Sequence, residues 1–153
     1  MRTIALALTL TIALINTAVA SGGDPLPTPK GTPKASAESA YNQGLALANA
    51  GDFVGAEAAY RDAIKLNPGL AEAWNGLGHA LKKQKRFDES LAAYDKALQL
   101  RPNFPLAMQY LGELYVELGQ MNNARALLAK LRPLDEENAN KLAAAIAIGS
   151  AKW

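Results

Sequence analysis

The residue types that carry most enzyme chemistry are scarce in this chain and do not form a group. There is one histidine, His79, and there are no cysteines, so disulfides, thiolate zinc sites and cysteine nucleophiles are excluded. A pair of histidines for a metal is excluded as well, and no motif joins His79 to a serine and a carboxylate. We therefore expect no enzyme activity, no catalytic residue, no cofactor and no metal, and we interpret His79 as a solvated or partner-facing side chain.

Two other features could in principle bind an anion. The Gly76-Leu77-Gly78 segment lacks the preceding strand that a phosphate-binding loop needs. The Lys82-Lys83-Gln84-Lys85-Arg86 run is interpreted as a solvated helix end, favourable to the helix dipole, with a site for acidic partners as the alternative. The formal net charge of +2 gives no indication of nucleic-acid binding.

The elements that would position any site recur with a period of 34 residues, which places Gly44, Gly78 and Gly112 in register. Within each period, apolar residues recur at three- and four-residue spacing, and turn residues such as Asn67-Pro68-Gly69 interrupt them. This pattern predicts two helices per period. A fixed period of this length is typical of stacked units that cannot bury their apolar faces alone.

The repeated positions resemble those of the tetratricopeptide repeat family. The second unit fits the hallmark pattern of that family at six positions: Trp74, Leu77, Gly78, Tyr94, Ala97 and Pro102. The first unit has Ala40 in place of the leading tryptophan. The third has Leu131 in place of a small alanine and Glu136 in place of the proline. We expect the small residues to let the backbones of paired helices approach closely, and the large aromatic residues to fill the core.

The resemblance implies a fold and a division of the chain. The expected fold is all-α, a right-handed α-solenoid of three tetratricopeptide helix pairs plus a C-terminal capping helix. The expected repeats cover residues 37–70, 71–104 and 105–138, and the capping helix and tail cover 139–153. Trp153, at the end of this tail, has no assigned role.

The first 36 residues have a different character. Arg2, the apolar run Ile4–Ile15 and the Ala18-Val19-Ala20 segment predict a secretory signal peptide over residues 1–20, cleaved after Ala20. An uncleaved membrane anchor is the alternative. Residues 21–36 contain four prolines and three glycines and are predicted to be a linker that acts as a passive spacer. We therefore expect an extracytoplasmic protein, in a bacterial periplasm or secreted, that meets a membrane only transiently through its signal peptide.

The resemblance also implies where a partner would bind, because members of this family line a concave groove with the first helix of each pair. Carried onto this sequence, the groove residues are Glu38, Tyr41, Leu45, Asn49, Glu72, Asn75, His79, Lys83, Leu106, Gln109, Glu113 and Glu117. The expected function is a non-catalytic adaptor that binds a peptide or protein there. The alternative is an assembly element that self-associates through its terminal repeat faces.

One known ligand of the family can be tested at single positions. Chaperone-binding members hold a carboxylate with lysine, asparagine and arginine at set groove positions, which in this chain are Tyr41, Leu45, Gly76, Leu106 and Tyr110. None of these side chains carries a charge. We therefore do not expect binding to the acidic tails of heat-shock chaperones.

Overall fold

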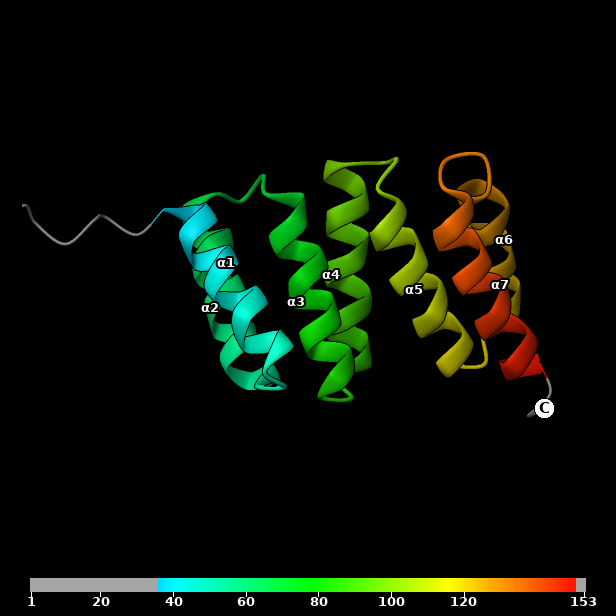
Figure 1. Cartoon of the computed structure of the whole chain (residues 1–153), viewed down its shortest axis with the longest axis horizontal. Coiled ribbons are helices and arrows are strands. Elements are labelled where there is room, and N and C mark those ends of the chain that lie inside the picture. Colours follow the sequence, from blue (N-terminus) through cyan, green and yellow to red (C-terminus); the bar gives the residue numbers. More distant parts are fainter. Residues whose placement is uncertain (1–35, 151–153) are drawn as a thin grey trace, which may run out of the picture. The chain divides into compact units, whose positions relative to one another are not determined.

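A computed structural model describes residues 36–150, all of them helical or in the short turns between helices (Figure 1). No strand occurs in this part of the chain, and the predicted all-α fold is confirmed. The predicted signal peptide, nearly all of the predicted linker and Trp153 lie outside the described residues. The seven helices are α1 (Ala37–Asn49), α2 (Phe53–Leu66), α3 (Ala71–Lys83), α4 (Phe87–Leu100), α5 (Pro105–Glu117), α6 (Met121–Leu131) and α7 (Glu136–Ser150).

Several helices begin at residues that bind the free N–H groups of the first turn. The Ser36 hydroxyl accepts a hydrogen bond from the Ser39 N–H, 3.0 Å away, and starts α1. The Asp52 carboxylate accepts from the Gly55 N–H at 2.8 Å and starts α2. Asp135 does the same for α7, accepting from the Asn138 N–H at 2.9 Å. These contacts explain why the chain can turn within a few residues between helices.

The turn inside each helix pair has the same backbone conformation every 34 residues. Gly51, Lys85 and Gly119 have φ values of 83°, 61° and 72°. This left-handed region is open to glycine and costs free energy for other residues, because their Cβ approaches the backbone. Lys85 therefore occupies a position that glycine fills in the other two units.

The helices form two layers. Helices α1, α3, α5 and α7 lie in one layer and α2, α4 and α6 in the other (Figure 1). The backbones of neighbouring helices of the first layer approach one another closely, whereas those of α2 and α4, and of α4 and α6, stay farther apart and meet through side chains such as Arg61 and Glu89, 3.5 Å apart. Because the helices of the first layer lie closer together than those of the second, the stack curves toward the first layer. We call the solvent side of α1, α3 and α5 the inner face.

Aromatic rings pack directly on the glycines of the helix pairs. The ring of Tyr60 lies between two glycines, and a Cβ on either Gly44 or Gly76 would come within 2.6 Å of its atoms. The ring of Tyr94 lies against Gly78 in the same way, at 2.8 Å from such a Cβ. Glycine at these positions makes room for an aromatic ring from another helix. Because Tyr60 contacts both α1 and α3, one side chain joins the first unit to the second.

The third unit solves the same packing problem with another helix. A Cβ on Gly112 would lie 2.5 Å from Leu142 of α7, a side chain with no exposed surface. Leu128 stands where the two earlier units have a tyrosine, and leucine has no aromatic ring to fill the space at the glycine. Helix α7 packs against both α5 and α6, as expected of a cap. It begins at Glu136, so the predicted boundary between residues 138 and 139 falls inside this helix, and the division of the chain stays a prediction.

Within residues 36–150, the search for a helix with the length and apolar character of a membrane span finds no candidate.

Candidate functional site

The twelve residues predicted to line a groove all lie on α1, α3 and α5, four on each helix. They differ in how much of each side chain a partner could reach. The exposed ones are Glu38, Leu45, Asn49, Lys83 and Glu117. The half-buried ones are Tyr41, Glu72, His79, Leu106 and Glu113, and the buried ones are Asn75 and Gln109. The structure therefore places the predicted set on one layer, while partner binding there stays a prediction.

His79 belongs to a group of stacked rings and is not simply solvated. Its imidazole stacks on Tyr110, with ring centroids 5.2 Å apart and planes 28° from parallel. Phe53, at the start of α2, meets the imidazole edge-on at 6.0 Å. The interpretation of His79 as a solvated or partner-facing side chain stays a prediction for the exposed part of the ring, because Phe53 of α2 and Tyr110 of α5 cover the rest. Burial lowers the pKa of His79, and the positive charges of Lys83 and Lys82 lower it further, so the side chain is neutral at pH 7.

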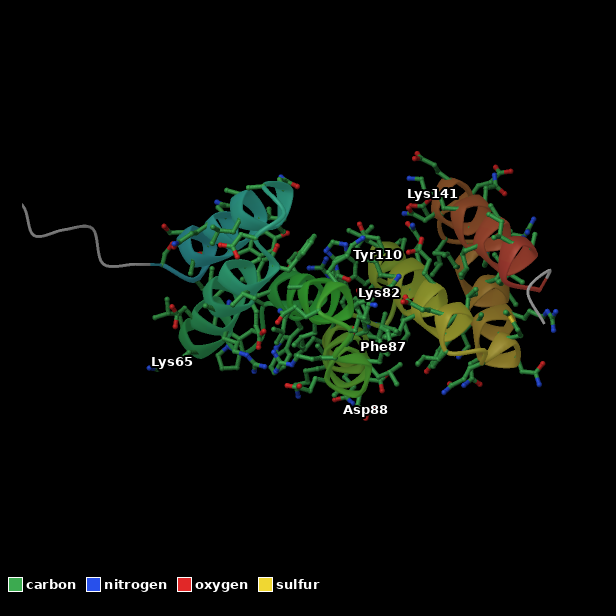
Figure 2. All side chains as sticks on the ribbon, turned by 90° about the horizontal axis from the view of Figure 1, so that it is seen from below. Lys65, Lys82, Phe87, Asp88, Tyr110 and Lys141 are labelled. Atoms are coloured by element: carbon green, nitrogen blue, oxygen red, sulfur yellow. The ribbon has the colours of Figure 1, made fainter. Side chains whose placement is uncertain are left out.

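An ion pair between helices lies beside these rings. Lys82 Nζ of α3 is 3.4 Å from Glu113 Oε2 of α5, and Gln109 Nε2 donates to the other carboxylate oxygen at 2.8 Å. Both charged side chains are largely shielded from water, which strengthens their attraction. Figure 2 shows Lys82 and Tyr110 close together where α3 meets α5.

Sequence reasoning missed Lys82 as part of this site, and it placed Tyr110 at a groove position without predicting its contact with His79. The available signal was spacing, because Lys82 lies three residues after His79 and so on the same side of the helix. The basic run is solvated only in part, because Lys83 and Lys85 are exposed whereas Gln84 and Arg86 contact α2. Gln84 Nε2 donates to the Phe53 carbonyl and to Glu57, at 3.1 and 2.9 Å, and Arg86 donates to Glu57 at 2.6 Å. These contacts fasten the end of α3 to α2, so the run is largely structural.

Glu72 is less available to a partner than its position suggested. Its carboxylate accepts a hydrogen bond from Arg101, at the end of α4. Burial raises the pKa of Glu72, but the contact with Arg101 outweighs that effect and leaves the pKa below its usual value. The guanidinium of Arg101 also lies over the Phe104 ring, 4.5 Å from its centroid. Glu72 therefore helps to join α3 to α4, and a partner would have to compete with Arg101 for it.

Two side-chain amides at the centre of the inner face lack hydrogen-bond partners for their oxygens. Asn75 and Gln109 are each only 6% exposed, and they stand 34 residues apart, on α3 and α5. Neither Asn75 Oδ1 nor Gln109 Oε1 accepts a hydrogen bond within the described residues. A buried oxygen without a donor costs about 1–3 kcal/mol. Such a cost at two equivalent positions makes these amides candidates for contact with a ligand.

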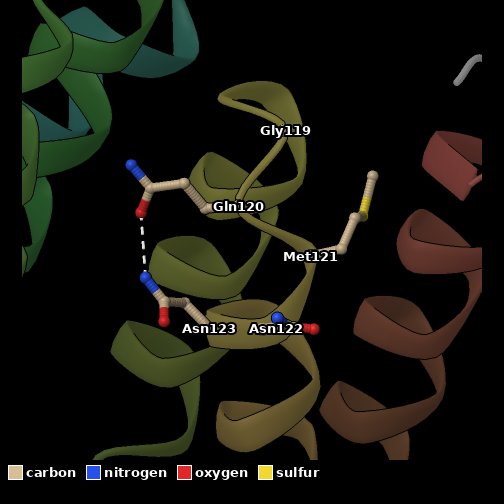
Figure 3. A pocket seen from close by; sticks show the side chains of 5 residues that line it. All are labelled: Gly119, Gln120, Met121, Asn122 and Asn123. Carbon is tan, nitrogen blue, oxygen red and sulfur yellow. Dashed lines mark hydrogen bonds between the residues drawn. The ribbon is translucent and has the colours of Figure 1, made fainter.

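Two hollows of the described surface lie away from the predicted residues. A cavity of about 310 Å³ surrounds the turn between α5 and α6, where Asn123 Nδ2 donates to Gln120 Oε1 at 2.9 Å (Figure 3). Another, of about 480 Å³, lies between the ends of α4 and α6 and is lined by Leu98, Met108 and Leu127 among others. Neither contains any of the twelve predicted residues. Within residues 36–150, no three or more histidine, aspartate or glutamate side chains are grouped so that they could hold a metal ion.

Comparison with known families agrees with this architecture. Three models of the tetratricopeptide repeat match residues 37–70, 71–104 and 93–126, and together they cover more than half of the chain. The chain belongs to the tetratricopeptide repeat family. The first two matches coincide with the helix pairs α1–α2 and α3–α4, and the third extends from the middle of α4 to the middle of α6.

Similar proteins are much longer than this chain. The peroxisomal targeting signal receptor of Saccharomyces cerevisiae is 31% identical over 97 residues, which cover 63% of this chain and 16% of the receptor. The human protein O-mannosyl-transferase TMTC2 is 43% identical over 63 residues, which cover 41% of this chain and 7% of that protein. The chain thus spans less than a fifth of either relative.

Two solved tetratricopeptide domains have a similar fold. The domain in the TPR2B-domain:pHsp70-complex of yeast Sti1 has a TM-score of 0.71 and 25% identity, over 76% of this chain and 98% of that one. The Arabidopsis OM64 TPR domain also has a TM-score of 0.71, with 19% identity over 77% of this chain and 97% of that one. These similarities confirm the solenoid fold.

Proposed function

We propose that this chain is a non-catalytic adaptor whose inner face binds a peptide or a segment of another protein. The observation that carries the proposal is the continuous row of polar and aromatic side chains that α1, α3 and α5 present at one face. A surface built from successive helices suits a linear ligand, which can contact each repeat in turn. A similar domain has been solved in complex with pHsp70, which supports this class of function.

The ligand we propose is not the acidic tail of a chaperone. The five positions where chaperone-binding members place charged and amide side chains hold Tyr41, Leu45, Gly76, Leu106 and Tyr110. None of them carries the positive charge or the side-chain amide that holds a carboxylate in those members. We further propose that the protein works outside the cytoplasm, on the basis of the charged, apolar and small-residue pattern of residues 1–20.

A photoreactive amino acid placed at two exposed inner-face positions would test the adaptor function in the native cell. Leu45 and Glu117 suit this purpose because both are exposed on α1 and α5. Asp62, exposed on α2 in the other layer, is the matched control position. We expect one protein of different sequence to be captured from Leu45 and Glu117 and not from Asp62.

Equal capture from all three positions would contradict inner-face binding. Capture of this chain alone would favour the assembly element, in which copies associate through their terminal repeats. Mass spectrometry of the crosslinked products distinguishes these outcomes.

A further inference from the structure

A groove runs between α4 and α6, in the layer opposite the inner face. Two hollows of about 300 and 480 Å³ share three lining residues and so form one continuous depression. On α6 its lining follows one side of the helix for two turns, which is about 10 Å at 1.5 Å per residue. We call this depression the outer groove; its lining includes Asp95, Leu98, Tyr115, Asn123, Leu127 and Lys130.

The equivalent groove between α2 and α4 is bridged by an ion pair. Arg61 of α2 lies 3.5 Å from Glu89 of α4, and both side chains line a hollow of about 200 Å³. The residues 34 positions later are Asp95 and Asn123, of which only Asp95 carries a charge. The outer groove therefore lacks the bridge of its neighbour and retains a carboxylate in its place.

Three oxygen acceptors without a donor line the outer groove near Asp95. The Asp95 carboxylate forms no hydrogen bond or ion pair with another residue of the described chain. Asn123 donates through its amide nitrogen to Gln120 at 2.9 Å, which leaves its oxygen free to accept (Figure 3). Burial raises the pKa of Tyr115, and the nearby charge of Asp95 raises it further. Asp95 and Asn123 are exposed and Tyr115 is half-buried, so a ligand can reach all three side chains from solvent.

This set of acceptors suits a guanidinium. Arginine presents five N–H donors in one plane and carries a permanent charge, whereas the lysine ammonium is compact and strongly hydrated. The arginine stem can pack on Leu98 and Leu127, the apolar residues of the groove. Burial raises the pKa of Asp95, which means that its carboxylate has lost part of its hydration. A cation from a ligand would offset that loss.

The shape and the charges of the outer groove favour a helical ligand. A helix packs into the groove between two others through residues spaced three, four and seven apart. Lys130 lies seven residues after Asn123 and forms no ion pair within residues 36–150. A ligand helix with an arginine at one end of this stretch and a carboxylate two turns away would therefore match Asp95 and Lys130 in charge.

We propose that the outer groove binds an amphipathic helix of a partner protein through an arginine of that helix. The guanidinium donates to Asp95, Asn123 and Tyr115, and apolar side chains of the helix cover Leu98 and Leu127. Because this groove and the inner face lie on opposite layers, both can be occupied at once, and the chain would then hold two proteins together. The proposal does not depend on what the inner face binds.

A displayed library of amphipathic helical peptides with one face randomised, selected against the full chain, tests this proposal. The library is first depleted on the double variant Asp95→Arg/Asn123→Glu, which copies the Arg61–Glu89 arrangement into the outer groove. This step removes peptides that bind anywhere else, the inner face included. The circular dichroism spectrum of the double variant should match that of the unchanged chain.

We expect the remaining peptides to carry an arginine on the selected face and to be helical when bound. Replacement of that arginine by citrulline, which is neutral and of nearly the same shape, should weaken binding about tenfold or more. Asp95→Asn should have a similar effect, and Tyr115→Phe should weaken binding about fivefold. Asp62→Asn, at an exposed position of α2, is the matched control and should leave the affinity unchanged.

The melting temperature separates a binding role from a structural one. Neither Asp95→Asn nor Tyr115→Phe should lower it, because neither removed group has a hydrogen-bond partner within the described chain. A loss of affinity that only accompanies a loss of stability would contradict the proposal.

Other results would also overturn it. These are a library from which no peptide remains after depletion, peptides that bind without an arginine, and an affinity insensitive to citrulline or to Asp95→Asn. A dimer of the chain in analytical ultracentrifugation that Asp95→Asn dissociates would assign the outer groove to a second copy instead. Each of these outcomes leaves the inner-face function standing, since crosslinking from Leu45 and Glu117 tests that function separately.

Discussion

At the scale of single residues, Lys85 shows how strongly the repeat constrains the backbone. Its φ of 61° matches the glycine positions of the other two turns, although lysine is disfavoured in this conformation by about 1–2 kcal/mol. The turn is nevertheless formed, with the Arg86 N–H bonded to the Leu81 carbonyl at 3.0 Å. The contacts of α3 and α4 on either side therefore offset the cost at Lys85.

The first prediction concerns this turn. Lys85→Gly should raise the free energy of unfolding by about 0.5–1 kcal/mol, since the gain in the folded state exceeds the added flexibility of the unfolded chain. Urea denaturation monitored by circular dichroism measures the change. Lys83→Gly, in the last turn of α3, is the control and should lower stability by up to about 1 kcal/mol. An equal decrease in the free energy of unfolding in both variants would show that the backbone at Lys85 is not strained.

At the scale of elements, α7 completes the third unit instead of only covering it. Leu142 fills the space above Gly112 that a tyrosine of the second helix fills in the earlier units. Gly149 of α7 also lies close to α5 and α6, and a Cβ at this residue would lie 2.4 Å from Val116 of α5. The third unit departs from the family pattern at Leu131 and Glu136, and it packs against the single helix α7 instead of a further helix pair.

The second prediction tests this role of α7. Leu142→Ala should lower the free energy of unfolding by about 2–5 kcal/mol, because it leaves a cavity against a glycine that cannot fill it. Thermal melts followed by far-ultraviolet circular dichroism suffice. Lys141→Ala, whose side chain forms only an exposed ion pair with Glu137, should change stability by less than about 1 kcal/mol. A small effect of Leu142→Ala would mean that α7 is detached in solution.

At the scale of the whole helical unit, a few aromatic side chains join neighbouring pairs. Tyr60 contacts glycines of α1 and α3, and His79 of α3 lies between Phe53 of α2 and Tyr110 of α5. In a repeat array each unit contacts only its neighbours, and contacts of this kind are what couple the neighbouring units. Because His79 titrates, the coupling between units becomes dependent on pH.

The third prediction follows from the lowered pKa of His79. The unfolded chain takes up the histidine proton near pH 6.5, whereas the folded chain takes it up only at lower pH. Between these two pKa values the unfolded state binds more protons, so stability falls as the pH is lowered through that window. Above about pH 7 this group contributes no pH dependence.

Denaturant titrations from pH 7.5 to 5.5 would reveal the effect. His79→Gln removes the only histidine of the chain, so the decrease over this range should become clearly smaller in the variant. An unchanged decrease would contradict the assignment to His79. Asp95 could not account for it, because burial raises the pKa of Asp95 and its protonation favours the folded state as the pH falls.

Much of the architecture could be predicted from the sequence because its causes are local. Apolar spacing, the glycine at residue 51 and the proline at residue 68 act within a few residues of the chain, and repetition every 34 residues implies stacking. The choice of the layer that holds the predicted groove residues came from the resemblance to the tetratricopeptide repeat family. Which residues on that layer are free, paired or buried did not follow.

Those details depend on contacts between residues far apart in the chain. The sequence alone determined the helix pairs, their turns and the absence of cysteine chemistry. Only the tertiary structure decided that His79 is covered by rings from α2 and α5, that Glu72 is bonded to Arg101, and that Leu142 fills the space at Gly112. It also decided that the oxygens of Asn75 and Gln109 lie without donors. The physical reason is that burial and hydrogen-bond satisfaction are properties of the packed neighbourhood, which no single helix carries.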